Sequence, residues 1–171
     1  MKEMVKYGST LTLICIIAAG LLAGVNVLTK SKIISQAHAE EEASLKEVLP
    51  LAVSFEPVKS EDAVLYYKAL DGEGKLMGAV FKASGKGYSS TIETMVGMLK
   101  DGTIAAIKVI SQNETPGLGS RVAEPTFTGQ FKNILDMSGA SAITGATISS
   151  RAVINSIENK AKEIRVFLAN E

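Results

Sequence analysis

The strongest constraint on this chain is a stretch of 23 residues without a charged side chain, from Tyr7 to Thr29, between Lys6 and Lys30. An α-helix rises about 1.5 Å per residue, so about 20 apolar residues cross a hydrocarbon core about 30 Å thick. A buried helix of a soluble domain would need apolar partners on every side, and no other segment here is apolar enough to surround it. The sequence therefore predicts one transmembrane anchor within residues 1–30.

A cleaved signal peptide is the alternative interpretation of this segment. Lys2 and Lys6 would form its basic region, and Ala-His-Ala at 37–39 resembles a cleavage site. However, the apolar run exceeds the roughly 7–15 residues usual in a signal peptide, and the candidate site lies eight residues beyond Thr29. We therefore expect an uncleaved anchor. Lysines on the two sides of the span are nearly balanced, so charge gives only a weak preference for a cytoplasmic N-terminus.

Composition excludes several classes of protein. The 171 residues hold 18 basic and 18 acidic side chains, and a balanced charge argues against a nucleic-acid-binding protein, which needs a basic surface. One cysteine and one histidine exclude an intramolecular disulfide, a cysteine-based zinc site, an iron–sulfur cluster held by this chain alone and a histidine-rich metal site. No metal site is expected.

The residues after the anchor divide into a helical stalk at 31–50 and one domain at 51–171. The stalk has helical character from Lys32 to Val48, and Pro50 ends it. From Phe55 to Ser111 the pattern changes to strands. The apolar runs are 64–70, 76–83, 88–99 and 104–110, separated by glycine-containing turns at 71–74, 85–87 and 101–102. Such turns between apolar runs predict an antiparallel meander.

The C-terminal part is predicted to be helical. Its apolar positions recur every three or four residues and form one stripe, which consists of Val153, Ile154, Ile157, Ala161, Ile164 and Leu168. Ser149 and Ser150 lie where the cap of a helix at 150–168 is expected. Strands followed by helices predict an α+β domain, with an antiparallel sheet and packed helices.

Two loops are candidates for a functional site. The first, Glu-Thr-Pro-Gly-Leu-Gly at 114–119, is either a structural Pro-Gly turn or a loop that lets the backbone approach a flat ligand. In the second interpretation the binding residues are Thr115, Gly117, Leu118 and Gly119. Glu114 is either a structural carboxylate or a participant in redox chemistry.

The second loop, at 143–150, precedes the C-terminal helix. It combines small residues, hydroxyl groups and the free N–H groups of a helix start, which together favour a phosphate group. Its candidate binding residues are Thr144, Gly145, Ala146, Thr147, Ser149 and Ser150. It contains no lysine of the Walker type, so it is not a nucleotide-hydrolysing P-loop, and the alternative is a capping loop rich in serine and threonine.

Thr-Gly-Ala-Thr at 144–147 resembles the attachment motif of the FMN-binding domain family, whose last threonine carries FMN through a phosphoester bond. Glu-Thr-Pro-Gly-Leu-Gly at 114–119 resembles the second signature of that family. Both motifs follow one anchor in the order typical of the G-subunit family of Rnf electron-transport complexes, and this resemblance covers nearly the whole chain. One departure is Ser141, which occupies a position where the family often has an acidic residue.

The resemblance implies a membrane subunit that carries covalent FMN on Thr147 and relays electrons inside a complex that couples ferredoxin and NAD redox chemistry to ion movement. Its partners would be the other membrane subunits of the complex and a flavin transferase, with residues 31–171 on the extracytoplasmic side. No residue of its own is expected to be catalytic. Two alternatives remain: the C subunit of a sodium-translocating NADH:quinone oxidoreductase, and an anchored binding or assembly module without a cofactor.

Overall fold

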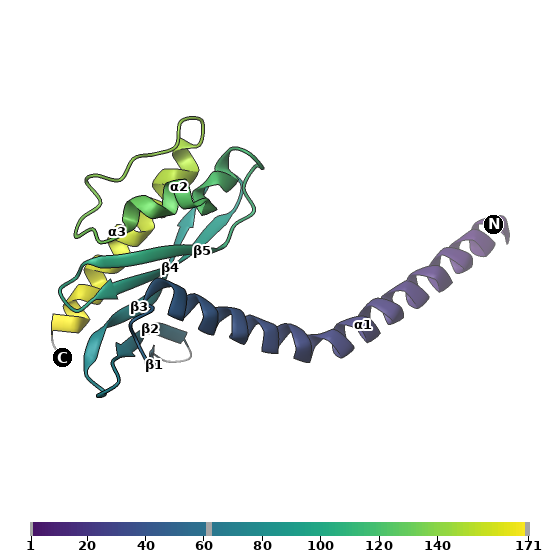
Figure 1. The fold of residues 1–171 in the computed structure, drawn as a ribbon. Helices are drawn as coiled ribbons and strands as arrows, with labels where there is room; N and C mark the ends of the chain where they lie inside the picture. Colours follow the sequence, from purple (N-terminus) through teal and green to yellow (C-terminus); the bar gives the residue numbers. More distant parts are fainter. Residues whose placement is uncertain (1, 61–62, 170–171) are drawn as a thin grey trace. The chain divides into compact units, whose positions relative to one another are not determined.

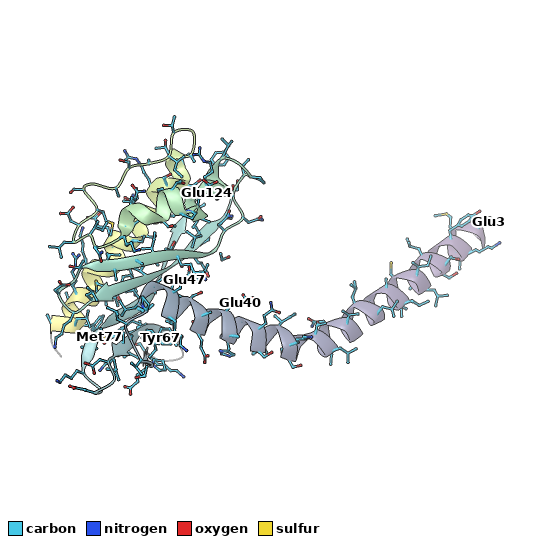
Figure 2. The ribbon with its side chains drawn as sticks, viewed as in Figure 1. Glu3, Glu40, Glu47, Tyr67, Met77 and Glu124 are labelled. Atoms are coloured by element: carbon cyan, nitrogen blue, oxygen red, sulfur yellow. The ribbon has the colours of Figure 1, made fainter. Side chains whose placement is uncertain are left out.

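The computed structural model describes residues 2–60 and 63–169. The chain divides into two compact units, Met1–Glu41 and Glu42–Glu171. The first unit is part of a single long helix, α1 (Lys2–Val48). Large apolar side chains are exposed along it from Met4 to Ile34, and none of its most apolar stretch is buried within the described structure (Figure 2). The helix is long and apolar enough to cross a membrane once.

The second unit is built on one five-stranded sheet. Its strands are β1 (Ser54–Ser60), β2 (Ala63–Leu70), β3 (Leu76–Lys86), β4 (Thr91–Leu99) and β5 (Ile104–Ser111). They pair in chain order, and every pair is antiparallel (Figure 1). The predicted meander is confirmed.

Both faces of the sheet are covered, because alternate residues of the central strands point in opposite directions. Phe81 and Val96 lie in the larger core, beneath α3 (Thr147–Ala169) and three short helices. The short helices are η1 (Gly119–Ala123), α2 (Pro125–Thr128) and η2 (Gly129–Phe131). Val80 and Met95 point to the other face and pack on the last turn of α1, where Leu45 and Val48 are buried. The compact unit thus includes the end of the expected stalk.

Helix α3 carries the predicted apolar stripe. All six stripe residues are buried against the sheet, as the three- and four-residue spacing requires. The predicted α+β domain is therefore confirmed, with helices on a sheet whose order follows the chain.

Two predicted boundaries are wrong. Gly85 was expected in a turn but lies in β3, paired with Ile92, and the turn follows at 87–90. A Cβ atom at Gly85 would lie 2.3 Å from the carbonyl oxygen of Ala152, so this glycine lets α3 approach the strand closely. The C-terminal helix begins at Thr147, and Ser149 and Ser150 therefore lie inside its first turn instead of capping it.

Candidate functional site

The loop at 114–119 leaves β5 and turns sharply before η1. The carbonyl oxygen of Thr115 accepts hydrogen bonds from the amides of Leu118 (3.2 Å) and Ser120 (3.3 Å). Gly117 has a φ of +74°, and its amide donates to Oγ of Ser120 at 3.0 Å. The loop is thus a closed turn that leaves the Leu118 side chain half-exposed and Gly119 buried.

The loop at 143–147 is held in a second tight turn. The amide of Ala146 donates to the carbonyl oxygen of Ile143 at 2.9 Å, and Gly145 adopts a φ of +84°. A positive φ at the third residue of a turn is the type II geometry, which favours glycine. Ser150 Oγ stabilises this turn, because it accepts from the amide of Ile143 (3.0 Å) and donates to the carbonyl oxygen of Ala146 (2.9 Å).

The turn presents Thr147 as the exposed first residue of α3. The first intrahelical bond of this region runs from the amide of Ser150 to the carbonyl oxygen of Ala146. The amides of Thr147, Ile148 and Ser149 precede that bond, so they are the orphan donors of the helix start. Together with the helix dipole they favour an anionic group beside the Thr147 hydroxyl.

Glu114 connects the two loops. Its side chain is buried, with 5% exposure. One oxygen, Oε2, accepts from Oγ of Ser149 (2.6 Å) and from the amide of Tyr88 (3.1 Å). The other, Oε1, accepts from the amides of Ser89 (2.9 Å) and Ser90 (2.8 Å). One carboxylate therefore ties the turn between β3 and β4 to the first turn of α3.

These donors keep Glu114 ionised. Burial acts to raise the pKa of Glu114, but the hydrogen bonds from Ser149, Ser90, Ser89 and Tyr88 outweigh burial, and the pKa lies below its ordinary value. Hydrogen bonds donated to the charged form of a carboxylate have this effect. The carboxylate is thus a fixed negative charge at this position.

The two loops enclose a cavity of about 410 Å³, within the range of small-molecule sites. Of the residues singled out in the sequence, seven line it: Thr115, Leu118, Gly119, Gly145, Ala146, Thr147 and Ser149. Gly117, Thr144 and Ser150 do not line it. Ser150 is fully buried and supports the turn, so its position suits a structural role.

Glu114, whose role the sequence left undecided, also lines the cavity. Two further lining residues, Tyr88 and Ile148, were not predicted from the sequence. Tyr88 lies in the turn at 87–90, far along the sequence from both motifs, so neither motif marks it. Ile148 interrupts a run of polar residues at 147–150, and this break in the run was an available signal. In the structure its side chain is exposed. With Leu118, these side chains give the mouth of the cavity an apolar rim.

A second cavity, of about 320 Å³, is lined by Thr144 together with Gln130 and Ser141. The side-chain amide of Gln130 forms two hydrogen bonds with the backbone of Ser141, one to its carbonyl oxygen (3.2 Å) and one from its amide (2.8 Å). The segment before the motif is thus fixed through its backbone, while the Ser141 side chain stays exposed.

Comparisons with known proteins agree with this geometry. Residues 87–162, which include both loops and Tyr88, match the FMN-binding domain family, and residues 1–48 match the RnfG N-terminal region. The G subunit of an ion-translocating oxidoreductase complex from Methanosarcina acetivorans is 36% identical, over 92% of this chain and 93% of that protein. The G subunit of a proton-translocating ferredoxin:NAD(+) oxidoreductase complex from Clostridium ljungdahlii is 30% identical, over 92% and 89%.

The fold also has a counterpart among solved structures. The crystal structure of NqrC from Shewanella oneidensis aligns with a TM-score of 0.54 at 22% identity and covers 72% of this chain and 74% of that chain. At this identity the likeness concerns the fold alone.

The cavity suits FMN. Its apolar rim is suited to an aromatic ring system, and the helix start is suited to a phosphate group. None of the residues described as lining it is a lysine or an arginine, so the donors available to a phosphate are backbone amides and hydroxyl groups.

Proposed function

Because the chain belongs to the G-subunit family of ion-translocating oxidoreductase complexes and carries an FMN-binding domain, we propose that it holds FMN covalently on Thr147 and relays electrons within a membrane-bound ferredoxin:NAD oxidoreductase. The observation that carries this proposal is the position of Thr147. Its hydroxyl is exposed at the first residue of α3, on the wall of the cavity that both family motifs line.

A phosphoester on Thr147 would reduce the electrostatic repulsion between FMN and this cavity. The cavity wall contains the Glu114 carboxylate and no basic side chain among its described lining residues, so free FMN, with a dianionic phosphate, meets repulsion. Esterification removes one of those two charges. The remaining charge lies at the helix start, where the amides of Thr147, Ile148 and Ser149 and the helix dipole stabilise it.

The chain's own residues would then orient and shield the cofactor. Bound FMN supplies reversible electron transfer, and the protein adjusts its potential through hydrogen bonds, burial and nearby charge. Leu118, Ile148 and Tyr88 provide apolar surface at the cavity mouth. We propose that α1 anchors this chain among the other membrane subunits of the complex.

Intact-mass measurement of the purified chain tests the proposal. When a flavin transferase is coexpressed, the wild-type chain should weigh more than its sequence by one FMN minus one water. Thr147→Val and Thr147→Ala should lack this mass, since the hydroxyl forms the bond. Thr144→Val is the matched control, because Thr144 is an exposed threonine of the same motif that does not line this cavity.

Two results would refute the assignment. Covalent flavin in Thr147→Ala would move the attachment site, and a wild-type chain without added mass would remove the covalent flavin altogether. The subunits that co-purify with the chain distinguish a ferredoxin:NAD oxidoreductase complex from a sodium-translocating NADH:quinone oxidoreductase.

A further inference from the structure

The Glu114 carboxylate accepts more hydrogen bonds than its place in a loop requires. It accepts hydrogen bonds from three consecutive backbone amides, at 88–90, and from the Ser149 hydroxyl, which lies 35 residues further along the chain. Both segments that it joins contribute to the cavity lining, one through Tyr88 and the other through Thr147. The position of one segment relative to the other therefore depends on this side chain.

The backbone is shaped around this carboxylate from two directions. A Cβ atom at Gly87 would lie 2.6 Å from Oε1, and a Cβ atom at Gly119 would lie 2.7 Å from Oε2. Any other residue at either position would have to displace Glu114 or the backbone. Both glycines are buried, so a side chain at either position would also meet a second neighbour, Ile92 beside Gly87 and Ser149 beside Gly119.

We propose that Glu114 is the positioning residue of the FMN site: its carboxylate fixes the turn at 88–90 against the first turn of α3 and places a negative charge in the cavity wall. The second half of this statement rests on the proposed binding of FMN, whereas the first half concerns the protein alone.

The charge has a defined effect on a redox cofactor. A negative charge in a poorly hydrated site interacts over several ångströms, because the local dielectric constant is low. Adding an electron to a nearby cofactor becomes less favourable, so the carboxylate lowers its midpoint potential. The hydrogen-bond donors around Glu114 are uncharged amides and two serine hydroxyls, so they hold the charge without neutralising it.

Glu114→Gln removes the charge with little change in volume. The glutamine oxygen can still accept from Ser89 and Ser90, but its NH₂ group then faces the amide of Tyr88, which is also a donor. Glu158→Gln is the matched control, because Glu158 is a partly exposed glutamate of α3 that pairs with Lys162 outside the cavity. Ser149→Ala deletes only the bond to α3 and keeps the charge.

Amide hydrogen exchange of the full chain without flavin tests the first half. Exchange of peptides covering 86–92 and 143–152 should become about tenfold faster in Glu114→Gln and remain unchanged in Glu158→Gln. Ser149→Ala should accelerate exchange at 143–152, and it keeps this half testable if Glu114→Gln does not accumulate. Exchange rates equal to those of the wild-type chain in both Glu114→Gln and Ser149→Ala would show that Glu114 does not fix the turn at 88–90 against α3.

Redox titration of the flavin-loaded chain tests the second half. The midpoint potential should rise in Glu114→Gln and stay at the wild-type value in Glu158→Gln. A shift in Glu114→Gln no larger than that in Glu158→Gln would overturn the role of the charge. A wild-type chain that carries no flavin would refute the proposed function instead. The exchange experiment would still test whether Glu114 fixes the turn at 88–90 against α3.

Discussion

At Gly119 a single methyl group tests how tightly the cavity wall is built. A Cβ atom there would lie 2.7 Å from both Oε2 of Glu114 and Oγ of Ser149, so Gly119→Ala must displace the carboxylate or the helix start. We expect a loss of about 1–3 kcal/mol in the free energy of unfolding, as for other overpacked sites. Urea unfolding of the full chain in detergent measures it.

The control for this variant is Gly129→Ala. Nothing lies within 4 Å of a Cβ atom at Gly129, and its φ of −64° suits alanine. This variant should retain the wild-type stability or gain slightly. Equal stability of the two variants would mean that Gly119 has room for a side chain.

The depressed pKa of Glu114 predicts how acid affects stability. A carboxyl group whose pKa is lower in the folded chain stabilises the fold fully at pH values above its unfolded pKa, here near 4.5, and this contribution disappears as pH falls through the folded pKa. Glu114→Gln removes the titrating group. The stability difference between wild type and Glu114→Gln should therefore be constant above about pH 5 and shrink in acid, as measured by thermal melts at a series of pH values. A difference that grows in acid would contradict the assigned direction.

Leu118→Ala tests the apolar rim. Leu118 is half-exposed, so shortening it should change the free energy of unfolding by less than about 1 kcal/mol. If the side chain covers the flavin, reduced flavin should react faster with a small added oxidant, and the flavin spectrum should shift. Stopped-flow oxidation of the wild-type and variant chains measures the effect. Unchanged rates and spectra would leave the loop at 114–119 a structural turn.

At the scale of elements, the sequence was most informative where periodicity is strong. The stripe from Val153 to Leu168 and the glycine-containing turns predicted α3 and the meander, because burial on one face dictates both patterns. The predicted boundaries were wrong where tertiary contacts determine the end of a helix or strand. Gly85 resembles a turn residue in its local sequence, yet the approach of α3 makes glycine necessary inside β3.

The candidate site shows the same division. Thr147, Gly145 and Leu118 lie within contiguous motifs, so the sequence could single them out. Tyr88 lies 26 residues from Glu114 along the chain, and the sheet register that brings their turns together is a tertiary property. The hydrogen bonds that Ser149 and Ser150 form also depend on the observed helix start.

Arg165 provides a test of how α3 is attached to its surroundings. Its guanidinium donates to the carbonyl oxygen of Gly102, at 2.9 Å, and to that of Leu135, and thereby joins the helix to two loops. Arg165→Gln should lower the free energy of unfolding by about 1–3 kcal/mol, because these carbonyl groups lose charged donors. Arg151→Gln, at an exposed position of the same helix, should change it by less than about 0.5 kcal/mol. Urea unfolding compares the two, and equal losses would deny Arg165 this role.

At the scale of the whole molecule, the main apolar surface that the described structure leaves uncovered is that of α1. Leu21, Leu22 and Leu28 are among its side chains that nothing in the described structure covers. In water such a surface would drive aggregation, whereas lipid or the helices of partner subunits would cover it. The first compact unit therefore has the properties expected of a membrane anchor, and the second carries the candidate site in a fold with its own two cores.

The side of the membrane that residues 31–171 occupy is the last prediction, and we expect the extracytoplasmic side. The chain starts with basic residues followed directly by one apolar span, the arrangement of a signal anchor whose N-terminus stays inside. Because Cys15 is the only cysteine, Cys15→Ser gives a background for single-cysteine labelling. On intact cells a membrane-impermeant maleimide should label Asn159→Cys, at an exposed position of α3, and should label Glu3→Cys only after the membrane is opened. The reverse pattern would place the flavin site in the cytoplasm.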